Sequence, residues 1–137
     1  MSAVTAFALA AALHAGFQVT VTVLVYPALA GRSAAEWSTA HARHSRAITP
    51  VVAVVYGALL VTGVGLVVAG PDLWGWVALV AAATALGLTA FVAAPAHGRL
   101  AERDERVLAR LLVADRGRCA AALVALVAAV LSVVATG

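Results

Sequence analysis

The side chains able to do chemistry form two groups, and the first lies along the N-terminal apolar stretch. His14, Gln18, Thr22 and Tyr26 recur there every four residues. Helical residues turn by about 100° each, so these four side chains share one broad face of a helix. Because imidazole and carboxamide groups are costly in hydrocarbon, we expect this face to point into a helix bundle. It would either hydrogen-bond to neighbouring helices or line a pocket for a substrate, quinone or cofactor.

The second group consists of the three other histidines, His41, His44 and His97. His41 and His44 are three residues apart, a spacing that can present two imidazoles to one metal ion or one substrate. His97 follows Pro95 at the end of an apolar stretch and could approach the pair if the two segments pack side by side. No Cys or carboxylate stands beside them at metal-ligand spacing, so we predict no metal site. The alternative is that each is a half-exposed residue at the membrane surface.

The elements that position both groups are apolar spans. Hydrophobic residues make up 64% of the chain and charged residues 11%, against about 25% in a typical soluble domain, and the mean hydropathy is +1.04. A membrane-crossing helix needs about 20 apolar residues. The charge-free spans long enough for this are 1–31, 47–71, 73–98 and 119–137. This pattern excludes a soluble enzyme and a nucleic-acid binder.

We therefore predict an all-α membrane protein, with four transmembrane helices in a left-handed bundle. Residues 1–137 would form a single domain made of two hairpins. The approximate spans of the helices are 4–30, 50–69, 73–96 and 118–136. Tyr56, Thr62 and Thr84 are the polar residues of the middle helices that could complete the face of the first.

Short amphipathic helices are expected between the membrane helices of each hairpin. Ser33 and Glu36 fit a capping box, and Thr49-Pro50 is typical of the start of the second membrane helix. The first amphipathic stripe consists of Trp37, His41, His44 and Ile48, and the second of Leu100, Val107, Leu108, Leu111 and Leu112. Such stripes favour helices lying along the membrane surface with their apolar faces toward lipid.

The basic residues predict the orientation. All nine are arginines, and they lie in segments 31–49 and 97–118, whereas the turn Gly70-Pro71-Asp72 has none. The positive-inside rule then places both longer segments in the cytoplasm and both termini outside. Arginine without lysine, together with abundant alanine and valine, indicates a GC-rich bacterial genome. We expect a multi-pass protein of the bacterial cytoplasmic membrane.

Several kinds of chemistry have no motif in the chain. It lacks a Gly-rich phosphate loop, a nucleophile elbow and a Ser-His-Asp set. The membrane spans carry no carboxylate, which argues against a proton-coupled carrier of the usual kind.

A set of short motifs spread over nearly the whole chain resembles the anthrone-oxygenase-like family of small four-helix membrane proteins. The matching residues are Gly16, Val25-Tyr26-Pro27-Ala28-Leu29, Trp37, His41, Pro50, Pro95-Ala96-His97, Asp115 and Arg118. Most members of that family have no known function, and some are associated with oxidation of polycyclic anthrones to anthraquinones. The resemblance implies that His41 and His97 take part in catalysis, supported by Asp115 and Arg118.

Two functions therefore stand as hypotheses. The first is an oxygenase or oxidoreductase acting on a hydrophobic aromatic molecule, with a histidine at the cytoplasmic rim as general base. The second is a non-catalytic membrane subunit, small transporter or lipid-binding scaffold whose arginines hold anionic headgroups. The expected partners are membrane lipids and a hydrophobic small molecule, not nucleic acid, while the cofactor and oligomeric state stay open. The candidate binding residues are His14, Gln18, Tyr26, Trp37, His44, Asp115 and Arg118.

Overall fold

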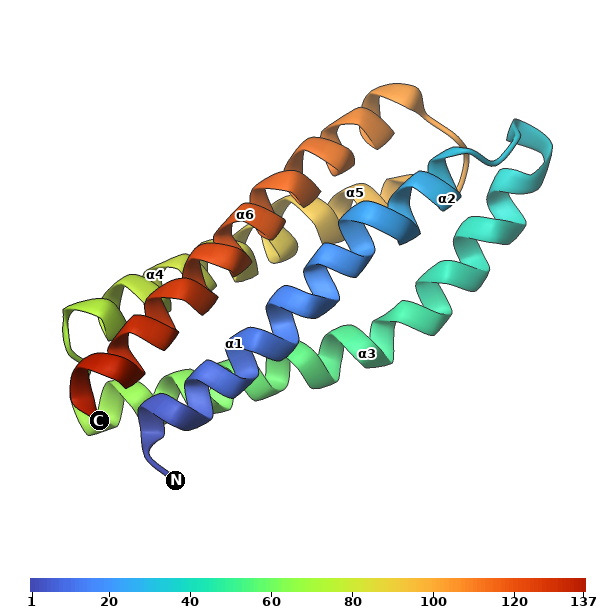
Figure 1. Cartoon of the computed structure of the whole chain (residues 1–137). Coiled ribbons are helices and arrows are strands. Elements are labelled where there is room, and N and C mark those ends of the chain that lie inside the picture. The colour runs from blue at the N-terminus through green and yellow to red at the C-terminus, as the bar shows by residue number, and fades with distance from the viewer.

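Four helical rods run up and down beside one another and form one bundle (Figure 1). The computed structural model describes residues 1–137. Each rod is long and apolar enough to cross a membrane, and the chain has no strands. The predicted all-helical membrane bundle is confirmed, while its left-handed twist stays a prediction. Both termini lie at one end with the turn at residues 70–72, called here the termini end (Figure 1). The connections at residues 31–33 and 100–104 lie at the opposite end, called the arginine-rich end.

The first and third rods share an irregular construction. Each contains a π-helical turn that ends two residues before a proline, Pro27 or Pro95. Proline lacks an N–H group and crowds the carbonyl four residues earlier, and a π turn widens the helix at that point. The prolines therefore do not end these rods. The segments are α1 (Ala3–Thr20), η1 (Val21–Val25) and α2 (Tyr26–Ala30), and then α4 (Leu73–Leu88), η2 (Thr89–Ala93) and α5 (Ala94–Arg99).

The second and fourth rods are longer than predicted because the amphipathic segments continue directly into the membrane helices. α3 runs unbroken over Ala34–Ala69, and α6 runs over Glu105–Thr136. The expectation that Thr49-Pro50 begins a helix is wrong. Pro50 lies inside α3, and the Thr49 hydroxyl donates to the carbonyl of Ser45 at 2.7 Å. The helix begins instead at the capping box of Ser33 and Glu36, and Pro50 lies in its interior.

The apolar stripes of these extensions pack inside the protein, and the expectation that they face lipid is wrong. Trp37, Leu108 and Leu111 are buried together with Leu100. The Trp37 indole N–H donates to the Leu100 carbonyl at 2.8 Å, which ties α3 to the connection before α6. Because each extension prolongs a rod of the bundle, its stripe prolongs the core.

The core has two parts, one in each half of the bundle. In the termini half, Phe7, Leu59 and Leu66 pack with alanines in an entirely apolar cluster. Small residues let α4 and α6 approach closely there. The buried alanines of this contact include Ala78, Ala82, Ala122, Ala125 and Ala129. The second cluster, around Tyr26 and Trp37, fills the arginine-rich half. Buried His14, Gln18, Asp115 and Arg118 lie between these clusters, whereas buried Ser132 bonds to Asp72 at the termini end.

Candidate functional site

A buried ion pair lies at the centre of the site. Arg118 Nη2 is 2.8 Å from Asp115 Oδ1, and the side chain of Gln18 donates to the same carboxylate oxygen at 2.7 Å. All three residues are more than nine-tenths buried. Asp115 lies outside the charge-free spans of the sequence, yet its carboxylate is buried inside the helix bundle. Asp115 and Arg118 are one helical turn apart and neutralise each other, so they enter the core as a pair.

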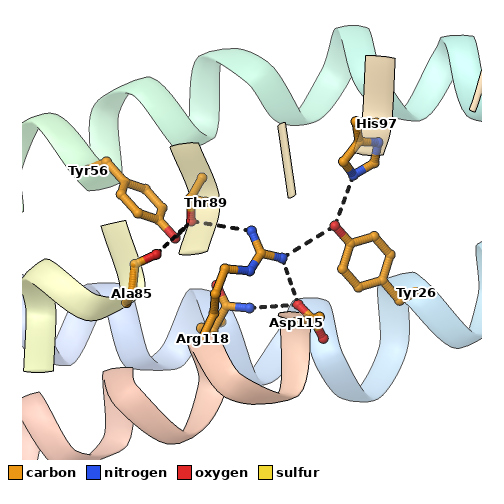
Figure 2. A network of polar contacts seen from close by, with 8 residues as sticks. Tyr26, Tyr56, Ala85, Thr89, His97, Asp115 and Arg118 are labelled. Atoms are coloured by element: carbon orange, nitrogen blue, oxygen red, sulfur yellow. Dashed lines mark hydrogen bonds and ion pairs between the residues drawn. The ribbon is translucent and has the colours of Figure 1, made fainter. Parts of the chain in front are cut away.

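A chain of hydrogen bonds leads from this pair to the histidines (Figure 2). Arg118 Nη2 donates to the Tyr26 hydroxyl at 3.3 Å, and that hydroxyl lies 2.9 Å from Nε2 of His97. Nδ1 of His97 then lies 3.1 Å from Nε2 of His41. The chain joins residues from four segments, α6, α2, α5 and α3, and runs toward the arginine-rich end.

The aromatic rings around His97 form a stacked group. The ring centroids of His41 and His44 lie 5.3 Å and 5.8 Å from that of His97, and Trp37 stacks on His41 at 5.6 Å. His97 therefore lies beside the other two histidines, an approach that the sequence allowed on condition that the two segments pack side by side. His41 is buried and His44 and His97 are half-buried, so His41 is not a half-exposed surface residue. No three His, Cys, Asp or Glu side chains converge in a geometry suited to a metal ion.

A second branch of the network leaves Arg118 on its other side (Figure 2). Thr89 Oγ1 donates to the Ala85 carbonyl at 2.9 Å, so it accepts from Arg118 at 3.5 Å and from the Tyr56 hydroxyl at 2.9 Å. Sequence reasoning named Tyr56 but missed Thr89. The only signal was a hydroxyl in an apolar span. Thr62 and Thr84, which share that signal, bond only to their own helices.

The polar face of the first rod points into the bundle, as predicted, but its residues differ in role. Gln18 holds Asp115, and Tyr26 joins the chain to His97. His14 is completely buried, touches the Tyr56 ring edge-on at 4.8 Å, and has no hydrogen-bonding partner at either ring nitrogen. Thr22 also has a buried hydroxyl without a partner. The face thus serves both as a contact between helices and as a wall of a cavity.

That cavity has a volume of about 340 Å³ and lies beside the hydrogen-bonded chain. Its polar wall contains Tyr26, His44, His97 and Arg118. Each of the remaining lining residues is apolar or carries a hydroxyl: Phe17, Val21, Ser45, Ile48, Thr49, Val52, Thr89, Ala93 and Ala94. Both π turns contribute to the lining, η1 through Val21 and η2 through Thr89 and Ala93.

The predicted site residues therefore fall into three positions. Four of them reach the cavity, as given above. His41, Trp37, Asp115 and Gln18 stand behind that wall, and His14 lies apart from it beside Tyr56. Comparison of the chain with models of protein families, with curated proteins and with solved structures gives no match.

Proposed function

We propose that this protein binds a hydrophobic aromatic molecule, anthrone- or quinone-like, in the cavity and oxidises it. The observation that carries the proposal is the division of the cavity wall. Apolar side chains cover most of it, while a phenol, two imidazoles and a guanidinium converge on one side. Its volume lies within the about 300–1,000 Å³ typical of small-molecule sites. Such a wall holds the body of an aromatic ligand and directs one polar edge toward groups that move protons.

The reaction that suits this wall starts with removal of an acidic proton. In an anthrone, loss of a methylene proton gives an electron-rich anion that reacts with dioxygen. Overall the CH₂ group and O₂ give a C=O group and water, so dioxygen is the oxidant. The residues facing the cavity accept the proton and hold the resulting oxyanion, and the Arg118 guanidinium is the cation nearest to it.

The resemblance to the anthrone-oxygenase-like family supports the same proposal. Tyr26, His97 and Arg118, which carry part of that resemblance, line one cavity although they are far apart in the sequence. His41 and Asp115 bond directly to these residues. A set of motifs placed by chance in four helices has no reason to converge on one hydrogen-bonded chain.

We also propose that the arginine-rich end faces the cytoplasm of a bacterium, with both termini outside. The exposed arginines of α3 and α6 lie at that end, and none lies at the termini end. A periplasm-active reporter fused after Gly137 should be active. A reporter active only in the cytoplasm at that position would reverse the orientation.

The oxidase proposal is tested with the purified protein in lipid nanodiscs and anthrone as substrate. The rates of oxygen uptake and of anthraquinone formation should both exceed the rates measured with empty nanodiscs. His97→Gln should lower the rate about a hundredfold, the usual size of a general acid–base contribution. Arg116→Gln, on the exposed face of α6, is the control and should keep the wild-type rate. A wild-type rate equal to that of empty nanodiscs, or full activity of His97→Gln, would contradict the proposal.

A lipid-binding role is the second candidate, and a separate groove favours it. This groove of about 700 Å³ lies between α2 and α3, with an apolar floor that includes Val25 and Leu29 and with Arg32 and Arg43 at its edge. It suits an acyl chain with an anionic headgroup. Native mass spectrometry should then show phosphatidylglycerol retained over phosphatidylcholine, and Arg32→Gln/Arg43→Gln should remove that preference. Equal retention of both lipids would exclude this role for the groove.

A further inference from the structure

We propose that Tyr26 is the residue that exchanges a proton with the ligand, and that His97 and His41 relay this proton to the arginine-rich end. The inference rests on the proposed function for its ligand. It differs from the sequence interpretation, in which His41 and His97 are catalytic and Tyr26 only binds. The geometry points to Tyr26 because its hydroxyl lies between a group that can only donate and a group that can accept.

The direction of the hydrogen bonds follows from Arg118. A guanidinium donates and never accepts, so the oxygen of Tyr26 accepts from Arg118 Nη2. The only proton of Tyr26 then goes to its other partner, Nε2 of His97. This nitrogen must be unprotonated.

The tautomers of both histidines follow in turn. A neutral His97 that accepts at Nε2 carries its proton on Nδ1 and donates it to Nε2 of His41. His41 then carries its own proton on Nδ1. This assignment gives each of the three hydrogen bonds one donor and one acceptor, whereas the reverse direction leaves the Tyr26 O–H without an acceptor.

A proton can move along this chain with atoms and charges in balance. The Tyr26 O–H bond breaks as a new N–H bond forms at Nε2 of His97. The Nδ1–H bond of His97 breaks as an N–H bond forms at Nε2 of His41. The products are a tyrosinate beside Arg118, a neutral His97 in the other tautomer, and an imidazolium at His41. No oxidant takes part.

The tyrosinate then removes an acidic proton from the ligand and becomes a phenol again. The ligand is left as an anion, and the proton is held at His41, which stands behind the cavity wall. Arg118 also lines the cavity, so its guanidinium places a positive charge beside the ligand oxyanion. Asp115 is bonded to Arg118 and Gln18 and keeps the guanidinium in place. In this scheme Tyr26 is a catalytic residue, and His97 and His41 carry the proton away from it.

The direction of the chain is tested without any ligand. In wild-type protein with ¹⁵N-labelled histidine in nanodiscs, nitrogen NMR should show the proton of His97 and of His41 on Nδ1. His97→Gln and His41→Gln variants assign the signals. A proton on Nε2 of His97 would overturn the relay.

The proton transfer is tested with anthrone in D₂O under anaerobic conditions, by following loss of its methylene protons in the ¹H NMR spectrum. The wild-type protein should accelerate the exchange. Tyr26→Phe should lower the accelerated rate at least tenfold, and His41→Gln should also lower it while leaving Tyr26 in place. The control is Thr20→Val, which removes a lipid-facing hydroxyl on α1 and should keep the wild-type rate. Wild-type exchange in Tyr26→Phe, or no acceleration by the wild type, would overturn the proposal.

This experiment separates the relay from the oxidation. Exchange that depends on Tyr26 without any anthraquinone formation in air would contradict the oxidation and leave the relay standing. Anthraquinone formation at the wild-type rate by Tyr26→Phe would contradict the relay and leave the oxidation standing.

Discussion

At the scale of single residues, the ion pair of Asp115 and Arg118 holds the site together. Arg118 bonds to Asp115, Tyr26 and Thr89, so it joins both branches of the network. A buried charge that loses its partner is strongly destabilising, by about 3–5 kcal/mol. The stability of the bundle and the geometry of the site therefore depend on the same guanidinium.

Arg118→Gln should accordingly destabilise the protein by about 3 kcal/mol, because it leaves the Asp115 carboxylate buried without a cation. Unfolding in mixed micelles with increasing dodecyl sulfate measures the effect. The matched control is Arg116→Gln, the same change two residues away on the exposed face of α6, which should be neutral. Equal effects of the two changes would mean that Asp115 and Arg118 are not a buried pair.

His14 and Gln18 are neighbours on one face but should respond in opposite ways to leucine. Gln18→Leu removes a donor from the Asp115 carboxylate and should cost about 1.5–3 kcal/mol, as for other hydrogen bonds to charged groups. His14→Leu removes two buried nitrogens that have no partner in the protein and should leave stability unchanged or higher. The same micelle titration compares them, with Thr20→Leu on the lipid-facing side as the control. A loss from His14→Leu as large as that from Gln18→Leu would refute the distinction.

Much of the residue-level picture was predictable from spacing. The four-residue repeat placed Gln18 and Tyr26 on an inward face, and the position of His97 allowed its approach to the other histidines if the two segments packed side by side. The burial of Asp115 was not predicted, because a search for charge-free spans assumes that every charged residue is exposed to water. An ion pair one turn apart neutralises itself and breaks that rule. Thr89 was not predicted because it lies at the start of a π turn, where the spacing of a regular α-helix does not give the direction of its side chain.

At the scale of elements, the π turns and the long helices are the features that shape the site. Whether a helix ends or widens at a proline depends on packing that short motifs do not encode. The amphipathic stripes predicted helices in the right places. The predicted contact of these stripes with lipid was wrong, because a stripe that packs on lipid and one that packs on a neighbouring helix have the same periodicity.

The turn between α3 and α4 gives a prediction at this scale. The Asp72 carboxylate accepts from the Ser132 hydroxyl of α6 and from the Gly75 N–H of α4, and these bonds hold the pKa of Asp72 below its ordinary value of 3.8. A lowered pKa means that the carboxylate stabilises the fold fully above about pH 4, and that this stabilisation is lost as the pH falls through the folded-state pKa. The wild-type protein should therefore lose thermal stability on acidification, and Ser132→Ala should make that loss smaller and complete at a higher pH.

Thermal unfolding between pH 6 and pH 3 measures this shift. Asp72→Asn should lack the loss of thermal stability that comes from protonation of this carboxylate, since an amide does not titrate. The control is Glu102→Gln, which removes an exposed carboxylate without a hydrogen bond and should keep the wild-type pH dependence. A Ser132→Ala curve that overlays the wild type would show that this hydrogen bond does not set the pKa of Asp72.

At the scale of the whole molecule, the two halves of the bundle differ in the polarity of their interiors. The termini half contains an apolar cluster of alanines, leucines and Phe7, and none of the titratable residues of the hydrogen-bonded chain lies in that cluster. The arginine-rich half contains the ionisable chain and the cavity beside it. This asymmetry favours binding and proton release at one side of the membrane over transport across it.

Binding of a flat aromatic molecule in the cavity beside Tyr26 and His97 is the property on which the proposed function depends. Equilibrium dialysis of anthraquinone, the oxidised form of the proposed substrate, against nanodiscs carrying each variant tests it most directly. Val52→Trp should fill the cavity without touching the hydrogen-bonded chain, because Val52 lines its apolar side. The matched control is Val54→Trp, which places the same ring on the lipid-facing side of α3, where Val54 is 67% exposed. We predict saturable binding by the wild type and by Val54→Trp, and loss of at least tenfold in affinity for Val52→Trp. Equal affinity of the two tryptophan variants, or no saturable binding by the wild type, would contradict the account.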